Sequence, residues 1–107
     1  MIPWSDMIGR VREYVLKAQD TQDEAYTDAA LTEWLKEAGR EIVARKRHLL
    51  VGADGVTRGT SEVVGDSGFD GPEKYSGALL HGCLMFAFAE DHDRSSFERG
   101  LFNAQLQ

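Results

Sequence analysis

The stretch YTDAALTEWLKEAGREIVARKRH, residues 26–48, decides the fold class because its apolar side chains recur at helical spacing. Its predicted apolar face consists of Leu31, Trp34, Leu35, Ala38 and Ile42. Thr27 is the expected N-cap, and Asp28 stands in the first turn, where a negative charge favours the helix dipole. The basic residues that end the stretch complement the same dipole at its C-terminal end, so they do not require a nucleic-acid partner.

Composition limits the classes of protein to which the chain can belong. The 107 residues suit one domain, and 12 Lys and Arg against 18 Asp and Glu give a net charge of −6. This balance disfavours binding to duplex DNA, which requires clustered cations. Cys83 is the single cysteine, so no internal disulfide forms and a reducing compartment is favoured. We expect no signal peptide and no membrane span, because no long apolar run is present.

Three further helices are predicted around this stretch. The first runs from a Ser5 cap to about Ala18 with one apolar stripe. The next begins at Pro72 and is apolar on most of its circumference, which predicts burial on more than one side. Its Gly77 and Gly82 would let another helix approach closely. The last helix starts with the pattern S-x-x-E formed by Ser95 and Glu98, a capping box. The sequence therefore predicts an all-α fold, a small four-helix bundle in a single domain that spans residues 1–107.

Residues 49–71 interrupt the helical pattern with six glycines. Asp54 and Gly55 fit a type I′ turn, so a short β-hairpin is one option for the beginning of this segment. An irregular glycine-rich loop, inserted between the second and third helices and ordered only by assembly, is the other option. Calcium binding by Asp54, Asp66 and Asp70 is disfavoured because the spacing of a calcium loop is absent.

The search for chemistry yields no catalytic site, no cofactor site and no metal site. His81 and Cys83 are two residues apart, which points them to different faces of a helix. A small enzyme or metal protein that uses His81, Cys83 and His92 is therefore the weakest hypothesis. The aromatic residues fall at helical spacing and are interpreted as core, including Trp34, Phe86 and Phe97.

The order of these helical blocks resembles the head-to-tail connector adaptor proteins of tailed bacteriophages. The blocks are DMIGRVREYV at 6–15, YTDAALTEWLKEAGREIV at 26–43 and YSGALLHGCLMFAFAEDHDRSSFERGLFNAQL at 75–106. The matching positions are Tyr26, Thr27, Asp28, Leu31, Trp34, Leu35, Arg40, Glu41, Ile42, Tyr75, Ala78, Leu79, Gly82, Leu84, Ala87, Phe97 and Glu98. Gly39, Cys83, Phe86 and Phe88 depart from the family's pattern, and the likeness omits 49–71.

The resemblance implies a virion structural protein rather than an enzyme. Such adaptors form a ring, usually of twelve copies, below the portal protein at one vertex of the capsid, in the neck of the virion. They are assembled in the host cytoplasm. The ring extends the channel through which viral DNA passes without specific binding, and it presents a surface to a downstream tail or second connector protein. The acidic chain agrees with such a channel because like charge removes the attraction to phosphate.

We expect the partner-binding residues to lie near the C-terminus and in the glycine-rich segment. They are Leu101, Phe102, Leu106, Gln107, Val51, Val56, Val63 and Val64. Helical spacing places Phe97, Leu101 and Ala104 on the face that packs inside the chain, which leaves Phe102 and Leu106 for the portal protein or an adjacent subunit. The alternative is that Phe102 and Leu106 widen the intramolecular face.

A second functional hypothesis is a small helical DNA-binding regulator. It would use the basic end of the second helix, formed by Arg40, Arg45, Lys46 and Arg47. The acidic total and the confinement of the basic residues to one helix end argue against this hypothesis.

Overall fold

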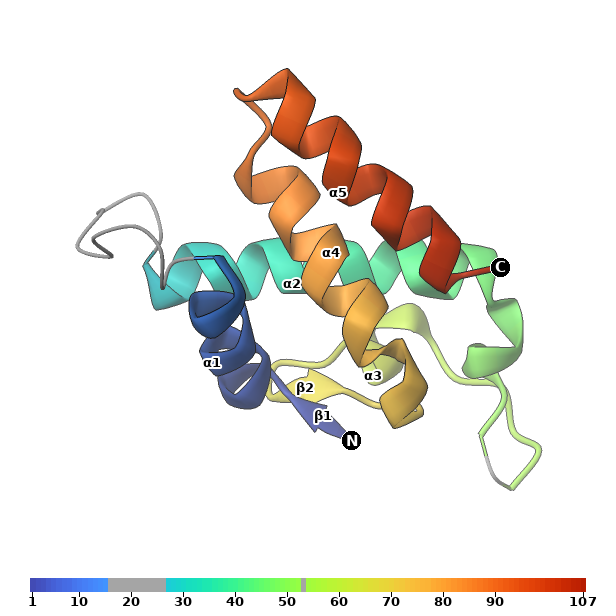
Figure 1. The fold of residues 1–107 in the computed structure, drawn as a ribbon. Coiled ribbons are helices and arrows are strands. Elements are labelled where there is room, and N and C mark those ends of the chain that lie inside the picture. The colour runs from blue at the N-terminus through green and yellow to red at the C-terminus, as the bar shows by residue number, and fades with distance from the viewer. Residues whose placement is uncertain (16–26, 53) are drawn as a thin grey trace.

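The computed structural model describes residues 1–15, 27–52 and 54–107. The predicted end of the first helix near Ala18 lies outside these residues. The described part is mostly helical, as predicted, and it folds into a compact body in which four longer helices carry the core (Figure 1). These helices are α1 (Trp4–Val15), α2 (Asp28–Arg45), α4 (Ser76–Ala87) and α5 (His92–Gln105).

Helix α2 forms as its sequence predicts and lies across α4 and α5 (Figure 1). The Thr27 hydroxyl accepts a hydrogen bond from the backbone N–H of Ala30 at 3.1 Å, which confirms the N-cap. The buried face includes Leu31, Leu35, Ala38, Ile42 and Val43. Trp34 is only half-buried and packs against the edge of the core. The helix ends at Arg45, and a 3₁₀ turn η3 (Arg47–Leu50) follows.

Helix α4 is buried on several sides, as its apolar circumference predicts, because it contacts α1, α2 and α5. A 3₁₀ turn η4 (Glu73–Tyr75) precedes it, so the predicted start at Pro72 was early by one turn. A Cβ atom at Gly82 would lie 2.6 Å from the Ala38 Cβ and 3.0 Å from the Phe102 ring. Because Gly82 has no side chain, α2 and α5 can both approach α4 closely at this position. The sequence suggested such a close approach.

The segment that was expected to be an irregular loop is structured in its second half. It contains α3 (Thr60–Val63) and β2 (Gly68–Phe69), and Phe69 is fully buried. β2 pairs antiparallel with β1 (Ile2–Pro3), with Ile2 opposite Phe69 and Pro3 opposite Gly68. The long glycine-rich loop and the four-helix bundle are thus not confirmed, because pairing with the N-terminus draws this segment into the core.

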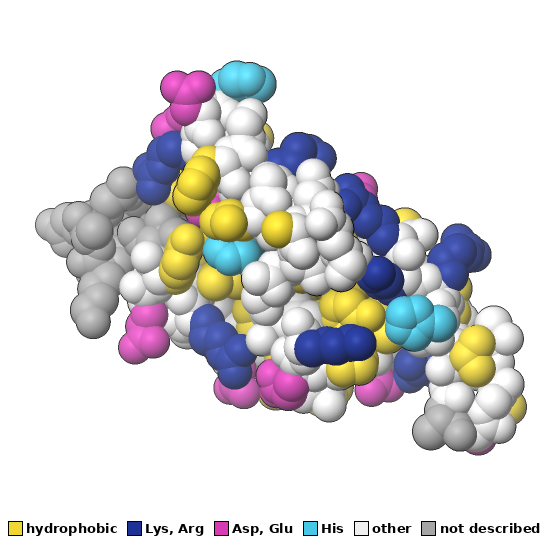
Figure 2. Space-filling model, turned by 45° about the vertical axis from the view of Figure 1, so that its right-hand side comes forward, with side chains coloured by type: hydrophobic (Ala, Val, Ile, Leu, Met, Phe, Trp, Pro, Cys, Tyr) yellow, Lys and Arg dark blue, Asp and Glu magenta, His cyan; other side chains and the backbone are white. Residues whose placement is uncertain are grey.

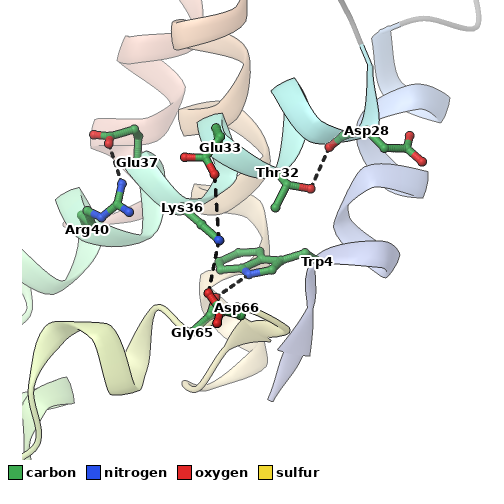
Figure 3. Close-up of polar contacts among 9 residues, drawn as sticks. All are labelled: Trp4, Asp28, Thr32, Glu33, Lys36, Glu37, Arg40, Gly65 and Asp66. Atoms are coloured by element: carbon green, nitrogen blue, oxygen red, sulfur yellow. Dashed lines mark hydrogen bonds and ion pairs between the residues drawn. The ribbon is translucent and has the colours of Figure 1, made fainter.

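Polar contacts fasten the same segment to α1 and α2 (Figure 3). The Trp4 indole N–H donates to the Gly65 carbonyl at 2.8 Å. The Lys36 ammonium lies 3.9 Å from the Glu33 carboxylate and 3.6 Å from that of Asp66. These contacts bring residues from three distant parts of the sequence to one place.

The first half of the segment is a hairpin, as one of the two predicted options states. Val51 and Thr57 form an antiparallel bridge, and the N–H of Gly55 donates to the Gly52 carbonyl at 2.9 Å. Gly55 has φ of +80°, and its hydrogen bond to Gly52 makes it the last residue of a turn and not one of the two central residues. The turn closed by this bond is therefore not the predicted type I′ turn with Asp54 and Gly55 at its centre.

Candidate interaction site

The structure divides the eight predicted partner-binding residues into buried and accessible groups. Phe102, Leu106, Val63 and Val64 are buried within the single chain. Leu101 is half-buried, and Val51, Val56 and Gln107 are exposed. The first four side chains therefore offer no surface to a partner in this conformation, while contact of the other four with a partner stays a prediction.

The expected orientation of α5 is wrong. Phe97 was assigned to the core, but its side chain is 64% exposed, whereas Phe102 is 0% exposed. The Phe102 ring packs over Gly82, and the Arg45 guanidinium lies 5.3 Å from the centre of this ring. Phe102 and Leu106 lie inside the chain, as the alternative states, but they replace the expected face and do not widen it, because Phe97 and Ala104 are exposed. The reason is that α5 has two apolar stripes, and the surface of α4 selects between them.

A buried polar pair fixes this orientation. Glu98, expected in a capping box, is 5% exposed, and its Oε2 lies 2.7 Å from Nδ1 of His81 on α4. The predicted capping box is wrong because α5 starts earlier than expected. The Asp91 side chain caps the helix by accepting a hydrogen bond from the Arg94 N–H at 3.3 Å. The Ser95 hydroxyl instead donates to the Met85 carbonyl at 2.8 Å.

Sequence reasoning missed this pair, although a signal for it was present. His81 and Glu98 stand at similar sequence distances from the turn between the last two helices. Residues placed in this way meet when two consecutive helices fold back on each other. The packing of α4 against α5 is the most extensive helix packing of the described chain. A polar residue on each of the two facing stripes therefore predicts a pair.

An accessible apolar surface surrounds the His81–Glu98 pair. The Tyr14 ring of α1 lies edge-on to the His81 ring, with 5.5 Å between the ring centres, and Tyr14 is half-exposed. Partial burial, followed by the negative charge of Glu98, raises the pKa of Tyr14. Phe97 and Leu101 flank Glu98 along α5. Figure 2 shows hydrophobic side chains gathered around a histidine on this side of the molecule. We call Tyr14, Phe97 and Leu101 the α5 surface.

A second accessible apolar surface lies on the hairpin, which projects from a different end of the molecule (Figure 1). Val51 is 50% exposed and Val56 is 60% exposed. The Arg58 guanidinium anchors the base of the hairpin: it donates to the Leu49 carbonyl at 3.0 Å and pairs with the Asp70 carboxylate. We call Val51 and Val56 the hairpin surface.

The residues considered for chemistry are separated in space. His81 faces α5, whereas the Cys83 thiol lies 3.9 Å from the Leu31 carbonyl of α2, so the prediction of different helix faces is confirmed. Burial raises the pKa of the Cys83 thiol to about 12, which keeps it protonated at neutral pH. Within residues 1–15, 27–52 and 54–107, no three His, Cys, Asp or Glu side chains cluster in a way that could hold a metal ion. No helix in the same ranges has the length and apolar character needed to cross a membrane.

The geometry thus offers two exposed apolar surfaces on different elements of one subunit, one beside the His81–Glu98 pair and one on the hairpin held by Arg58. Such surfaces suit contact with other protein chains. Comparison of the chain with models of protein families, with curated proteins and with solved structures finds no match.

Proposed function

We propose that this protein is a ring-forming head-to-tail connector adaptor of a tailed bacteriophage, which docks on the portal protein and extends the DNA channel. The observation that carries the proposal is the order and spacing of the helical blocks that resemble this family. The proposed partners are the portal protein, neighbouring copies of the chain and a downstream tail or second connector protein. The proposed location is the portal vertex of the virion.

Nine of the 17 positions that carry the resemblance are buried in the described part of the chain. The buried members of the matched set are Leu31, Leu35, Ile42, Tyr75, Ala78, Leu79, Gly82, Leu84 and Glu98. They come from α2, η4, α4 and α5 and lie where these elements pack. A match at packing positions supports a shared arrangement of helices, which is the property that an adaptor family retains while its exposed surfaces vary.

The distribution of exposed apolar residues also supports an assembling subunit. A ring of identical copies requires two different surfaces on each subunit, so that one copy contacts the next in a head-to-tail manner. The α5 surface and the hairpin surface lie on different ends of the chain (Figure 1). Tyr14, Phe97, Val51 and Val56 remain exposed on these two surfaces.

The portal protein encoded in the same genome provides the test. The full-length chain is mixed with purified portal rings, and the mixture is examined by negative-stain electron microscopy and analytical ultracentrifugation. We expect portal particles to gain an added layer of density and to sediment faster. Portal particles that remain unchanged at every protein concentration would exclude the adaptor function. Duplex DNA in place of the portal tests the DNA-binding regulator, whose affinity must fall steeply with salt.

A further inference from the structure

Two groups of like-charged residues lie at different ends of the described chain. Three carboxylates lie in and directly after the connection between α4 and α5, those of Glu90, Asp91 and Asp93. Three cations lie at the end of α2 and the start of η3, those of Arg45, Lys46 and Arg47. Figure 1 shows the two regions apart, and Figure 2 shows acidic side chains at the upper tip and Lys and Arg side chains along the right-hand side.

Each group of charges borders one of the two exposed apolar surfaces. Asp93 stands one helical turn before Phe97 on α5, and both are exposed. At the other end, η3 leads directly into the hairpin, where the Val51 N–H donates to the His48 carbonyl at 3.1 Å. Arg47 and His48 are exposed beside Val51. One end therefore combines an aromatic ring with three carboxylates and one cation, Arg94, whose guanidinium lies over the Phe88 ring. The other end combines valines with cations.

The ion pairs found among the described residues include none of these six charged side chains. The subunit is 46 Å long, while charges in water at physiological ionic strength are screened over about 8 Å. The acidic end therefore cannot satisfy the basic end of the same copy, but it can approach that of another copy.

We infer that the acidic end of one copy, with Phe97 at its centre, docks on the basic end and the hairpin valines of the next copy. This inference rests on the proposed function and assigns the neighbour contact of the ring. The apolar side chains supply the burial, while the charges orient the approach and exclude the pairing of like ends. Because the two ends differ, the contact is heterologous and either closes into a ring or continues as a filament.

A charge-swap experiment on the full chain tests the inference without the portal. Variant one carries Glu90→Lys and Asp93→Lys, and it keeps Asp91, which caps α5. Variant two carries Lys46→Glu and Arg47→Glu. Asp6→Lys, at an exposed site in the first turn of α1 that belongs to neither charged end, is the control for net charge. Circular dichroism first checks that each variant folds, and sedimentation velocity then measures self-association.

The wild type should self-associate, and its association should weaken as salt rises. Each variant alone should associate about tenfold more weakly, whereas the control should behave as the wild type does. An equimolar mixture of the two variants should regain association, because the new lysines of one face the new glutamates of the other. The variant with all four substitutions should regain it as well.

Several results would overturn the inference. They are a wild-type chain that stays monomeric, variants that associate as the wild type does, and a mixture that fails to regain association. Binding of duplex DNA that is lost only in variant two, with no rescue by mixing, would assign the basic end to nucleic acid instead. Portal binding is measured separately, so failure of the neighbour contact and failure of the adaptor function give different patterns.

Discussion

The α4–α5 pair and the segment 46–71 both bury a phenylalanine completely, but different interactions hold them in place. Phe102 and Phe69 are each 0% exposed. Phe102 lies between two long helices that fit together at Gly82. Phe69 lies in a two-residue strand, and its position depends on pairing with Ile2 and on contact with the Tyr75 ring, whose centre is 6.3 Å away.

The difference shows how two kinds of sequence can give equally buried residues. In the helical pair, many similar contacts repeat along the interface, so each residue is supported by its neighbours on the helix. In segment 46–71, a few single contacts fix an otherwise glycine-rich backbone whose ordering costs much conformational entropy. We therefore expect substitutions in the helical pair to affect the whole fold, and the polar ties of the segment to affect it locally.

The largest effect is expected for Phe102→Ala. Loss of the ring leaves a cavity between α2, α4 and α5, which should lower the free energy of unfolding by about 3–5 kcal/mol. Phe97→Ala on the same helix is the matched control and should change it by less than about 0.5 kcal/mol, because that ring is exposed. Urea denaturation measures both. Equal losses in the two variants would contradict the observed orientation of α5.

Phe69→Ala tests whether segment 46–71 belongs to the cooperative unit. Its ring fills space near Gly39, Val64 and Tyr75, so its removal should cost about 3 kcal/mol. The loss should appear in the same transition that helix content reports. Increased amide exchange restricted to residues 60–71, at an unchanged midpoint of unfolding, would instead make the segment an independent unit.

His81→Leu should lower the free energy of unfolding by about 1–3 kcal/mol, because the buried Glu98 carboxylate loses its hydrogen-bond partner. The double variant His81→Leu, Glu98→Leu should recover much of that loss, since neither polar group then remains unpaired. Thermal and urea unfolding of the wild type, His81→Leu and the double variant measure these differences in the free energy of unfolding. A double variant less stable than His81→Leu would show that the pair is not the reason for the loss.

Arg58→Met should act locally on the hairpin. The substitution keeps much of the apolar stem but removes the bond to the Leu49 carbonyl and the pair with Asp70, at a cost of about 1 kcal/mol. The Nε atom is buried without a hydrogen-bond partner, so its loss partly offsets this cost. Amide exchange at Gly52 and Arg58 should accelerate, while exchange in α4 should not. Unchanged exchange at the hairpin would exclude the anchoring role.

The smallest effect concerns Cys83 at alkaline pH. Its pKa is raised from 9.0 to about 12 in the folded chain, so the unfolded chain releases the thiol proton first. The corresponding stability is present below pH 9.0 and declines as pH rises toward 12. Compared with Cys83→Ala, the wild type should lose roughly 1 kcal/mol per pH unit in that range. Urea denaturation of both proteins measures the difference, and parallel pH profiles would contradict it.

The sequence by itself determined the features that depend on local spacing. Helical periodicity accounts for the buried face of α2 and for the burial of α4 on several sides. Capping chemistry accounts for the Thr27 cap, and the small size of Gly82 accounts for the close approach of neighbouring helices. Each of these signals lies within a few turns of one helix. A single sequence is sufficient to recognise them because the physical cause is local as well.

Only the tertiary structure decided which stripe of α5 is buried and what residues 49–71 form. Phe97 and Phe102 are equally apolar, and the choice between them depends on Gly82 and His81 of another helix. Phe69 becomes a strand residue because Ile2 lies beside it, 67 positions away in the sequence. These outcomes arise from the energy of contacts between distant segments, which spacing within one segment does not encode.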